Sequence, residues 1–177
     1  MGYIKYIREM VGQKPIITCG ASVLLFNQEG QLLMQRRKDN NLWGYAGGVV
    51  EMDETVENAA KRELYEETGL TALSLELFGV FSGKELHFKY PNGDEINVID
   101  VVFTCKAYEG TLSLQEKEVT ELCFFDIDKL PAAIFSPAVP IIKALQKCYR
   151  REGKSWFLDY KWGQNHKDIS NYSNPRN

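Results

Sequence analysis

Residues 48–70 read GVVEMDETVENAAKRELYEETGL, the most informative stretch of the chain. The spacing of its apolar residues predicts a helix from about Val56 to Thr68. Thr55 is a suitable N-terminal cap for this helix, and Gly69 is placed to end it. The stretch therefore predicts one well-delimited helix preceded by a loop that contains two glycines.

Three glutamates of this helix lie on its apolar side. At about 100° per residue, Glu63, Glu66 and Glu67 point toward the side that carries Ala59 and Ala60. A solvated acidic helix, the alternative interpretation, would place its glutamates opposite its apolar residues. Glu63 and Glu67 also repel each other, since they are four residues apart. Carboxylates gathered in this way need a cation, and hard oxygen ligands favour Mg²⁺ or Mn²⁺.

The loop before the helix carries two further features. Gly47 and Gly48 allow the backbone to approach a ligand closely. Arg62 is expected to point away from the glutamate face, and Glu54 lies in the loop. An ion pair between Glu54 and Arg62 would attach the loop to the helix.

The segment resembles the Nudix box, Gx5Ex7REUxEExGU, where U is a bulky aliphatic residue. Its fixed positions are filled by Gly48, Glu54, Arg62-Glu63-Leu64, Glu66-Glu67 and Gly69-Leu70. The resemblance is to MutT-like members of the Nudix hydrolase family and covers about residues 15–150. One departure is Ala46, where many members have proline before the glycine pair.

The resemblance implies an α/β protein with the Nudix fold, an α/β/α sandwich around a mixed β-sheet. It implies hydrolysis of a nucleoside diphosphate linked to another moiety, such as a nucleoside triphosphate, ADP-ribose or another sugar nucleotide. The implied cofactor is Mg²⁺ or Mn²⁺, held by Glu63, Glu66 and Glu67. Glu54 and Arg62 match the structural pair of the family.

A further acid in the loop before the last strand often serves the family as an extra ligand or base. The candidates here are Glu116, Glu118 and Glu121, of which Glu118 is favoured. The expected catalytic residues are therefore the three box glutamates and Glu118.

The candidate substrate-binding residues are Arg37, Gly47, Gly48, Trp43 and Tyr45. Strand alternation lets only one of Arg36 and Arg37 face the site, and Arg37 is favoured as a phosphate contact. Trp43 and Tyr45 flank the glycine loop, where they either stack on a base or cover the core.

We expect the whole chain to divide into three parts. Residues 1–14 are expected to form an N-terminal extension with an amphipathic helix over 3–12, residues 15–150 the Nudix domain, and residues 151–177 a polar, aromatic tail. We expect 155–162 to dock on the body or on a second subunit. Within the domain, 16–26 and 31–36 are predicted to pair as a hairpin, 37–47 to be a loop, and 138–149 to be a closing helix.

Composition excludes several classes of protein. The 177 residues carry a net charge of −3 and are 44% apolar, which is typical of a single soluble globular domain. No basic stripe indicates a nucleic-acid partner, and no apolar run approaches the roughly 18 residues of a membrane helix. The four cysteines show no metal or redox spacing, and the N-terminus is no signal peptide. We expect a cytoplasmic protein with a small nucleotide substrate. Because many members of the family are dimers, we also expect a homodimer.

Two other functions are compatible with the fold. A non-catalytic Nudix-fold nucleotide sensor usually lacks box glutamates, whereas this chain retains them. An isopentenyl diphosphate isomerase needs a catalytic cysteine just before the box, where residues 37–50 contain none. Both are less favoured than a hydrolase.

Overall fold

A computed structural model describes residues 2–90, 92–114 and 118–152. Its helices are α1 (Tyr3–Val11), α2 (Val56–Thr68) and α3 (Val139–Glu152), with short 3₁₀ turns at Lys84–Leu86, Ile127–Lys129 and Ser136–Ala138. Its strands are β1 (Ile16–Leu25), β2 (Leu32–Arg37), β3 (Trp43–Gly44), β4 (Ala46–Val49), β5 (Leu70–Ala72), β6 (Glu76–Phe81), β7 (His87–Lys89), β8 (Glu95–Cys105), β9 (Tyr108–Gly110) and β10 (Val119–Phe125).

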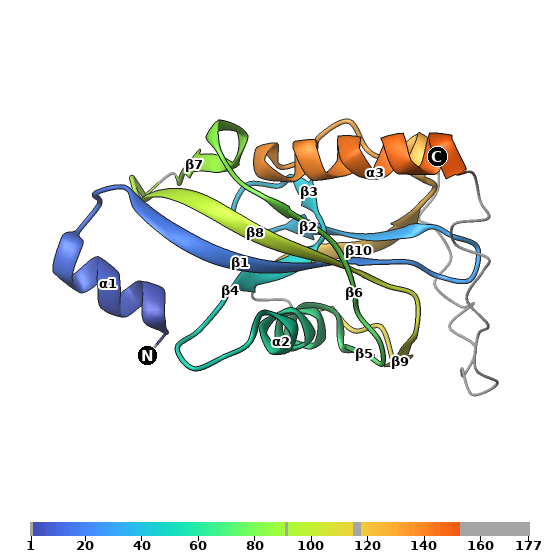
Figure 1. Cartoon of the computed structure of the whole chain (residues 1–177), viewed down its shortest axis with the longest axis horizontal. Helices are drawn as coiled ribbons and strands as arrows, with labels where there is room; N and C mark the ends of the chain where they lie inside the picture. Colours follow the sequence, from blue (N-terminus) through green and yellow to red (C-terminus); the bar gives the residue numbers. More distant parts are fainter. Residues whose placement is uncertain (1, 91, 115–117, 153–177) are drawn as a thin grey trace.

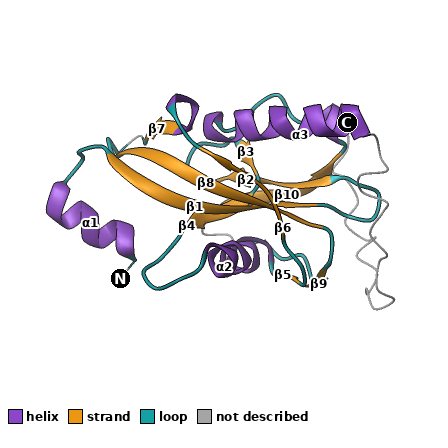
Figure 2. Ribbon diagram, viewed as in Figure 1, coloured by secondary structure: helices purple, strands orange, loops and turns teal. Residues whose placement is uncertain are grey.

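The largest sheet is mixed and has the strand order β4-β1-β8-β6, with β7 also paired to β8. Its central pair, β1 and β8, is parallel from Ile16↔Ile96 to Leu25↔Cys105, and the other pairs are antiparallel. A second, antiparallel sheet has the order β10-β2-β3, and β5 pairs with β9. Figures 1 and 2 show the long β1 and β8 running side by side through the molecule.

The central sheet is covered by helices on both faces. On one face, Ala59, Ala60 and Leu64 of α2 belong to a core cluster with Val23 and Phe103 of the sheet. On the other face, α3 contributes to a second cluster that contains Ile141, Ile142, Leu145, Leu24 and Val102. Figure 1 shows α2 below and α3 above the strands, so the predicted sandwich around a mixed sheet is confirmed.

The predicted hairpin of 16–26 and 31–36 is wrong as a strand pairing. The turn at Asn27–Gly30 does form, and the Asn27 side-chain oxygen accepts a hydrogen bond from Gln31 N at 2.8 Å. Only the bridge Phe26↔Leu32 links the two strands, however. All ten residues of β1 pair with β8 instead, while β2 pairs with β10 and β3.

The predicted loop 37–47 also contains regular structure. β4 pairs with β1 so that Gly47 faces Ser22 and Gly48 faces Ala21. The edge of β1 that does not face β8 would otherwise leave backbone groups unpaired. The glycine segment satisfies them, and it therefore belongs to the sheet.

The predicted N-terminal helix is confirmed as α1. It lies beyond one end of the sheet (Figure 1). Arg8 of this helix donates a 2.8 Å hydrogen bond to Glu95 O and forms an ion pair with Asp94 at 3.6 Å. The expected docking segment 155–162 lies outside the described residues. The division of the chain into extension, domain and tail stays a prediction.

Candidate active site

Helix α2 begins and ends where its sequence predicts. The Thr55 hydroxyl accepts a 3.2 Å hydrogen bond from Asn58 N, and Gly69 closes the helix in the left-handed region at φ 72°. Glu67 is buried, Glu63 is half-buried and Glu66 is exposed. The three glutamates thus extend from the buried face of the helix to its edge.

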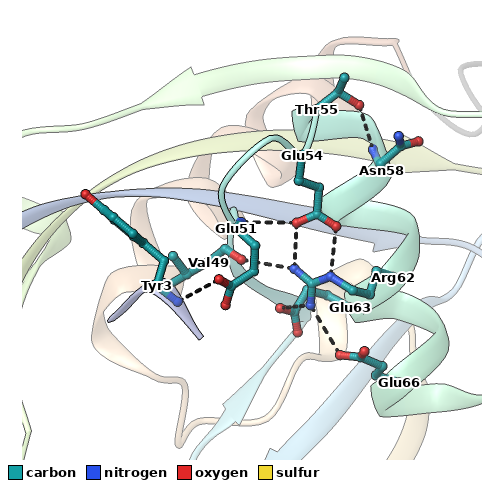
Figure 3. A network of polar contacts seen from close by, with 9 residues as sticks. All are labelled: Tyr3, Val49, Glu51, Glu54, Thr55, Asn58, Arg62, Glu63 and Glu66. Carbon is teal, nitrogen blue, oxygen red and sulfur yellow. Dashed lines mark hydrogen bonds and ion pairs between the residues drawn. The ribbon is translucent and has the colours of Figure 1, made fainter. Parts of the chain in front are cut away.

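Glu54 and Arg62 form the predicted structural pair. Arg62 Nε donates to Glu54 Oε1 and Nη2 donates to Oε2, each at 2.9 Å, and Nη2 also donates to Val49 O at 3.1 Å (Figure 3). The hydrogen bond from Arg62 holds the pKa of Glu54 below its ordinary value. This arrangement attaches the loop after β4 to the middle of α2.

The expectation that Arg62 points away from the glutamate face is wrong. Its Nη1 lies 2.6 Å from Glu63 Oε1 and 3.2 Å from Glu66 Oε2 (Figure 3). Residues 62 and 66 are neighbours on a helix surface, and a guanidinium has five donors on a long stem. Arg62 therefore bridges the loop acid to two glutamates of the box.

Glu67 is held against the glycine strand. Its Oε2 accepts a 2.9 Å hydrogen bond from the backbone N–H of Gly47, and the buried side-chain amide of Gln35 in β2 lies near enough to lower its pKa. Burial raises the pKa of Glu67 to about 8, because these two neutral donors offset only part of the desolvation. Gln35 is not among the site residues predicted above, although a polar residue at the end of the run LLMQ was an available signal.

Gly48 lies against the carboxylate of Glu63. A Cβ at Gly48 would stand 2.7 Å from Glu63 Oε2 and closer still to Oε1 and Cδ. A side chain at position 48 would displace this carboxylate from its position. The structure therefore supplies a steric reason for glycine at position 48, beside the predicted approach to a ligand.

The acidic side chains influence one another electrostatically. Burial raises the pKa of Glu63, and the charges of Glu66 and Glu118 raise it further, although Arg62 opposes them. Glu63 in turn raises the pKa of Glu67. Glu66 and the exposed Glu118 thus lie within electrostatic reach of Glu63, and Glu63 lies within electrostatic reach of Glu67.

The donor set suits a divalent cation in its chemistry and charge. Carboxylate oxygens are the ligands that Mg²⁺ and Mn²⁺ prefer, and mutual repulsion among these groups favours a bound cation. In the described ranges, no three His, Cys, Asp or Glu side chains already enclose a common point. Glu63 and Glu66 turn toward Arg62, while Glu67 turns toward Gly47.

Arg37 lies beside the acidic cluster. Burial lowers its pKa, but the hydrogen bond to Asp39 and the nearby charges of Asp39, Tyr90 and Glu67 raise it overall. Its guanidinium carbon is 4.9 Å from the centre of the Phe135 ring. A cation within reach of Glu67 and next to half-buried aromatic rings is well placed to meet a phosphorylated ligand.

The two aromatic candidates differ in their surroundings. Trp43 is buried, with 8% of its surface exposed, and its ring packs edge-on against Phe125 at 5.0 Å between centroids. This packing fits the core-cover alternative and leaves little ring surface for stacking on a base. Tyr45 packs against the same core cluster, and its hydroxyl donates to Asp100 Oδ2 at 3.4 Å.

Asp100 is a second residue near the site that was not predicted from the sequence. It is buried in β8, where Ser22 Oγ donates to its two oxygens at 2.9 and 3.1 Å. Burial raises the pKa of Asp100 to about 6. A lone carboxylate inside the apolar strand INVIDVVF was the signal that could have found it.

Comparison with known proteins agrees with this geometry. The family model of the NUDIX domain matches residues 18–145, and the chain belongs to this family. Among its relatives are a MutT-like protein of Streptomyces ambofaciens, 33% identical over 96 residues (54% of this chain), and an ADP-ribose pyrophosphatase of Methanocaldococcus jannaschii, 35% identical over 114 residues (63% of this chain). The matches span 56% and 63% of the length of these two relatives.

Solved structures support the same assignment. A MutT NUDIX hydrolase from Burkholderia pseudomallei superimposes with a TM-score of 0.60 at 25% identity, covering 75% of this chain and 98% of the other. Within the part of the chain that the structure describes, no helix is both long and apolar enough to cross a membrane.

Proposed function

We propose that this protein is a metal-dependent Nudix pyrophosphohydrolase that cleaves a nucleoside diphosphate linked to another moiety. The observation that carries the proposal is the complete set of box glutamates on one side of α2. Glu67 is buried against the glycine strand, and Glu63 and Glu66 are tied to Arg62.

The residues of the chain have distinct parts in this proposal. Glu63, Glu66 and Glu67 would hold Mg²⁺ or Mn²⁺, which supplies positive charge for phosphate oxygens and lowers the pKa of water. Glu118, whose charge raises the pKa of Glu63, is the candidate for an extra ligand or for the base that accepts a proton from the attacking water. Arg37 would bind a phosphate of the substrate, and Glu54 and Arg62 would hold the loop in place.

The substrate class is either a nucleoside triphosphate or an ADP-ribose-like sugar nucleotide. The second is supported by the relative from Methanocaldococcus jannaschii that is named ADP-ribose pyrophosphatase. Nucleic acid is not the proposed partner, and the homodimer stays a prediction.

A substrate panel tests the proposal. Common and oxidised nucleoside triphosphates, ADP-ribose, other sugar nucleotides and dinucleoside polyphosphates are incubated with Mg²⁺ or Mn²⁺, and phosphate is measured with and without added phosphatase. We expect fast turnover of one class, lost in Glu67→Gln and kept in Glu57→Gln, which neutralises an exposed glutamate of the same helix.

Two outcomes would contradict the proposal. Wild-type turnover by Glu67→Gln would remove Glu67 from the mechanism. No turnover of any substrate, together with tight nucleotide binding by calorimetry, would indicate the non-catalytic sensor instead.

A further inference from the structure

We propose that Asp100 is a positioning residue, which acts with Ser22 to fix strand β4 so that the backbone of Gly47 holds the carboxylate of Glu67. The catalytic consequence rests on the proposed function. The structural linkage itself does not, and it can be measured separately.

Asp100 is a charged group that the sheet encloses. It is 7% exposed, and it accepts hydrogen bonds from Ser22 Oγ at 2.9 and 3.1 Å and from Tyr45 Oη at 3.4 Å. Burying a carboxylate costs free energy unless hydrogen-bond donors or opposite charges are held in place around it. Its two donors come from β1 and from the residue just before β4, so Asp100 ties these two segments to β8.

Ser22 transmits this attachment to the glycine strand. It is the register partner of Gly47 across the β1–β4 pair. A Cβ at Gly47 would stand 2.8 Å from Ser22 Cα and closer still to Ser22 Oγ. The backbone of β4 is therefore packed directly on the residue that donates to Asp100.

Gly47 carries the linkage to the site. Its N–H donates to Glu67 Oε2 at 2.9 Å. The amide of Gln35, which lies near enough to Glu67 to lower its pKa, donates to Tyr45 O at 3.4 Å. A shift of residues 45–47 would thus move the Gly47 N–H that holds Glu67 and the carbonyl to which Gln35 is bonded.

Four variants separate positioning from plain stabilisation. Asp100→Leu replaces both acceptor oxygens by methyl groups on the same branched skeleton, Ser22→Ala removes one donor, and Asp100→Asn keeps an acceptor for Ser22. Thr104→Val is the matched control, because it deletes a buried hydroxyl from the same strand that bonds to Glu76 O at 3.4 Å. The readouts are amide hydrogen exchange at Gly47 by NMR, Mn²⁺ affinity by paramagnetic resonance, and kcat and KM.

Positioning predicts a specific pattern. In Asp100→Leu and Ser22→Ala, we expect the Gly47 amide to exchange about tenfold faster relative to the buried amides of β8. We expect Mn²⁺ to bind more weakly and kcat to fall about tenfold with KM changed little. Asp100→Asn recovers most of the loss, and Thr104→Val matches wild type in all three measurements.

Ser22→Ala decides the matter if Asp100→Leu does not fold. Unchanged relative exchange at Gly47 in the folded variants would overturn the proposal and leave Asp100 a merely stabilising group. If the wild-type protein hydrolyses nothing, the proposed function fails, and the exchange data still decide whether Asp100 positions Gly47.

Discussion

Gly48 lies directly against Glu63, so that a methyl group on Gly48 would stand 2.7 Å from Glu63 Oε2. We expect Gly48→Ala to displace this carboxylate and to lower kcat about tenfold or more, because misplacing a catalytic group by about 1 Å costs up to two orders of magnitude. The free energy of unfolding, measured in urea, should change by less than about 1 kcal/mol, since the Glu63 side chain can rotate away from the added methyl group.

Gly44→Ala is the matched control for this glycine. No atom in the described ranges, apart from its chain neighbours, lies within 4 Å of a Cβ at Gly44. We expect wild-type kcat from it. Equal kcat in both alanine variants would show that the contact between Gly48 and Glu63 does not matter for turnover.

Glu67 should make the metal-free protein less stable as the pH rises. Burial raises its folded pKa to about 8 from an ordinary value of 4.5. Between these two values the unfolded chain binds fewer protons than the folded one, so stability falls with rising pH and the penalty is complete above about pH 8. Glu67→Gln removes this penalty.

Urea unfolding with a chelator at pH 4.5 and pH 8.5 measures the effect. Wild type should lose about 4 kcal/mol more stability over this range than Glu67→Gln, while the contribution of Asp100 is common to both proteins. Parallel pH dependences in the two proteins would contradict the burial of a titrating carboxylate at this position.

Arg62 should contribute to stability as well as to the site. We expect Arg62→Lys to lower the free energy of unfolding by about 1–3 kcal/mol, because lysine cannot reproduce the two-pronged contact with Glu54. Arg36→Lys is the control: Arg36 pairs with Glu121 at 3.6 Å near the surface, and its loss should cost less than about 0.5 kcal/mol. Similar losses in both variants would argue against a special role for Arg62.

The cap of α2 gives a smaller and purely local prediction. Thr55→Ala should lower stability by about 1 kcal/mol, since Asn58 N loses its acceptor. Thr55→Ser keeps the hydroxyl and should restore most of it. Chemical denaturation of the three proteins checks this, and an alanine variant as stable as wild type would show that the cap is dispensable.

Local signals were enough to predict α2 and its ends. A capping threonine, a terminal glycine and the spacing of Ala59, Ala60 and Leu64 all act within the helix itself. The connection between β7 and β8 is local as well: Asn92-Gly93 is a dipeptide typical of hairpin turns, Tyr90 N donates to Asp94 O at 2.7 Å, and β7 pairs antiparallel with β8. Such features need no knowledge of the rest of the chain.

Pairings between distant segments were not predictable from one sequence. Strand β1 pairs with β8, which lies about 80 residues later in the chain. Nothing in the sequence of β1, IITCGASVLL, indicates which strand pairs with it. The contacts of Gln35 with Glu67 and of Asp100 with Ser22 depend on that topology. The direction of the Arg62 side chain was predicted wrongly for another reason. A helical projection gives the directions of the Cβ atoms but does not describe how far a long side chain reaches.

Tyr3, the first residue of α1, is attached to the loop between β4 and α2, which contains Glu51 and Glu54. Tyr3 N donates to Glu51 Oε2 at 2.7 Å, and Glu51 N donates to Glu54 Oε2 at 3.1 Å (Figure 3). We therefore expect an affinity tag fused ahead of Tyr3 to disturb residues 51–54, the segment that Arg62 holds. If the proposed activity holds, we expect kinetic constants measured on such a fusion to change when the tag is removed by protease.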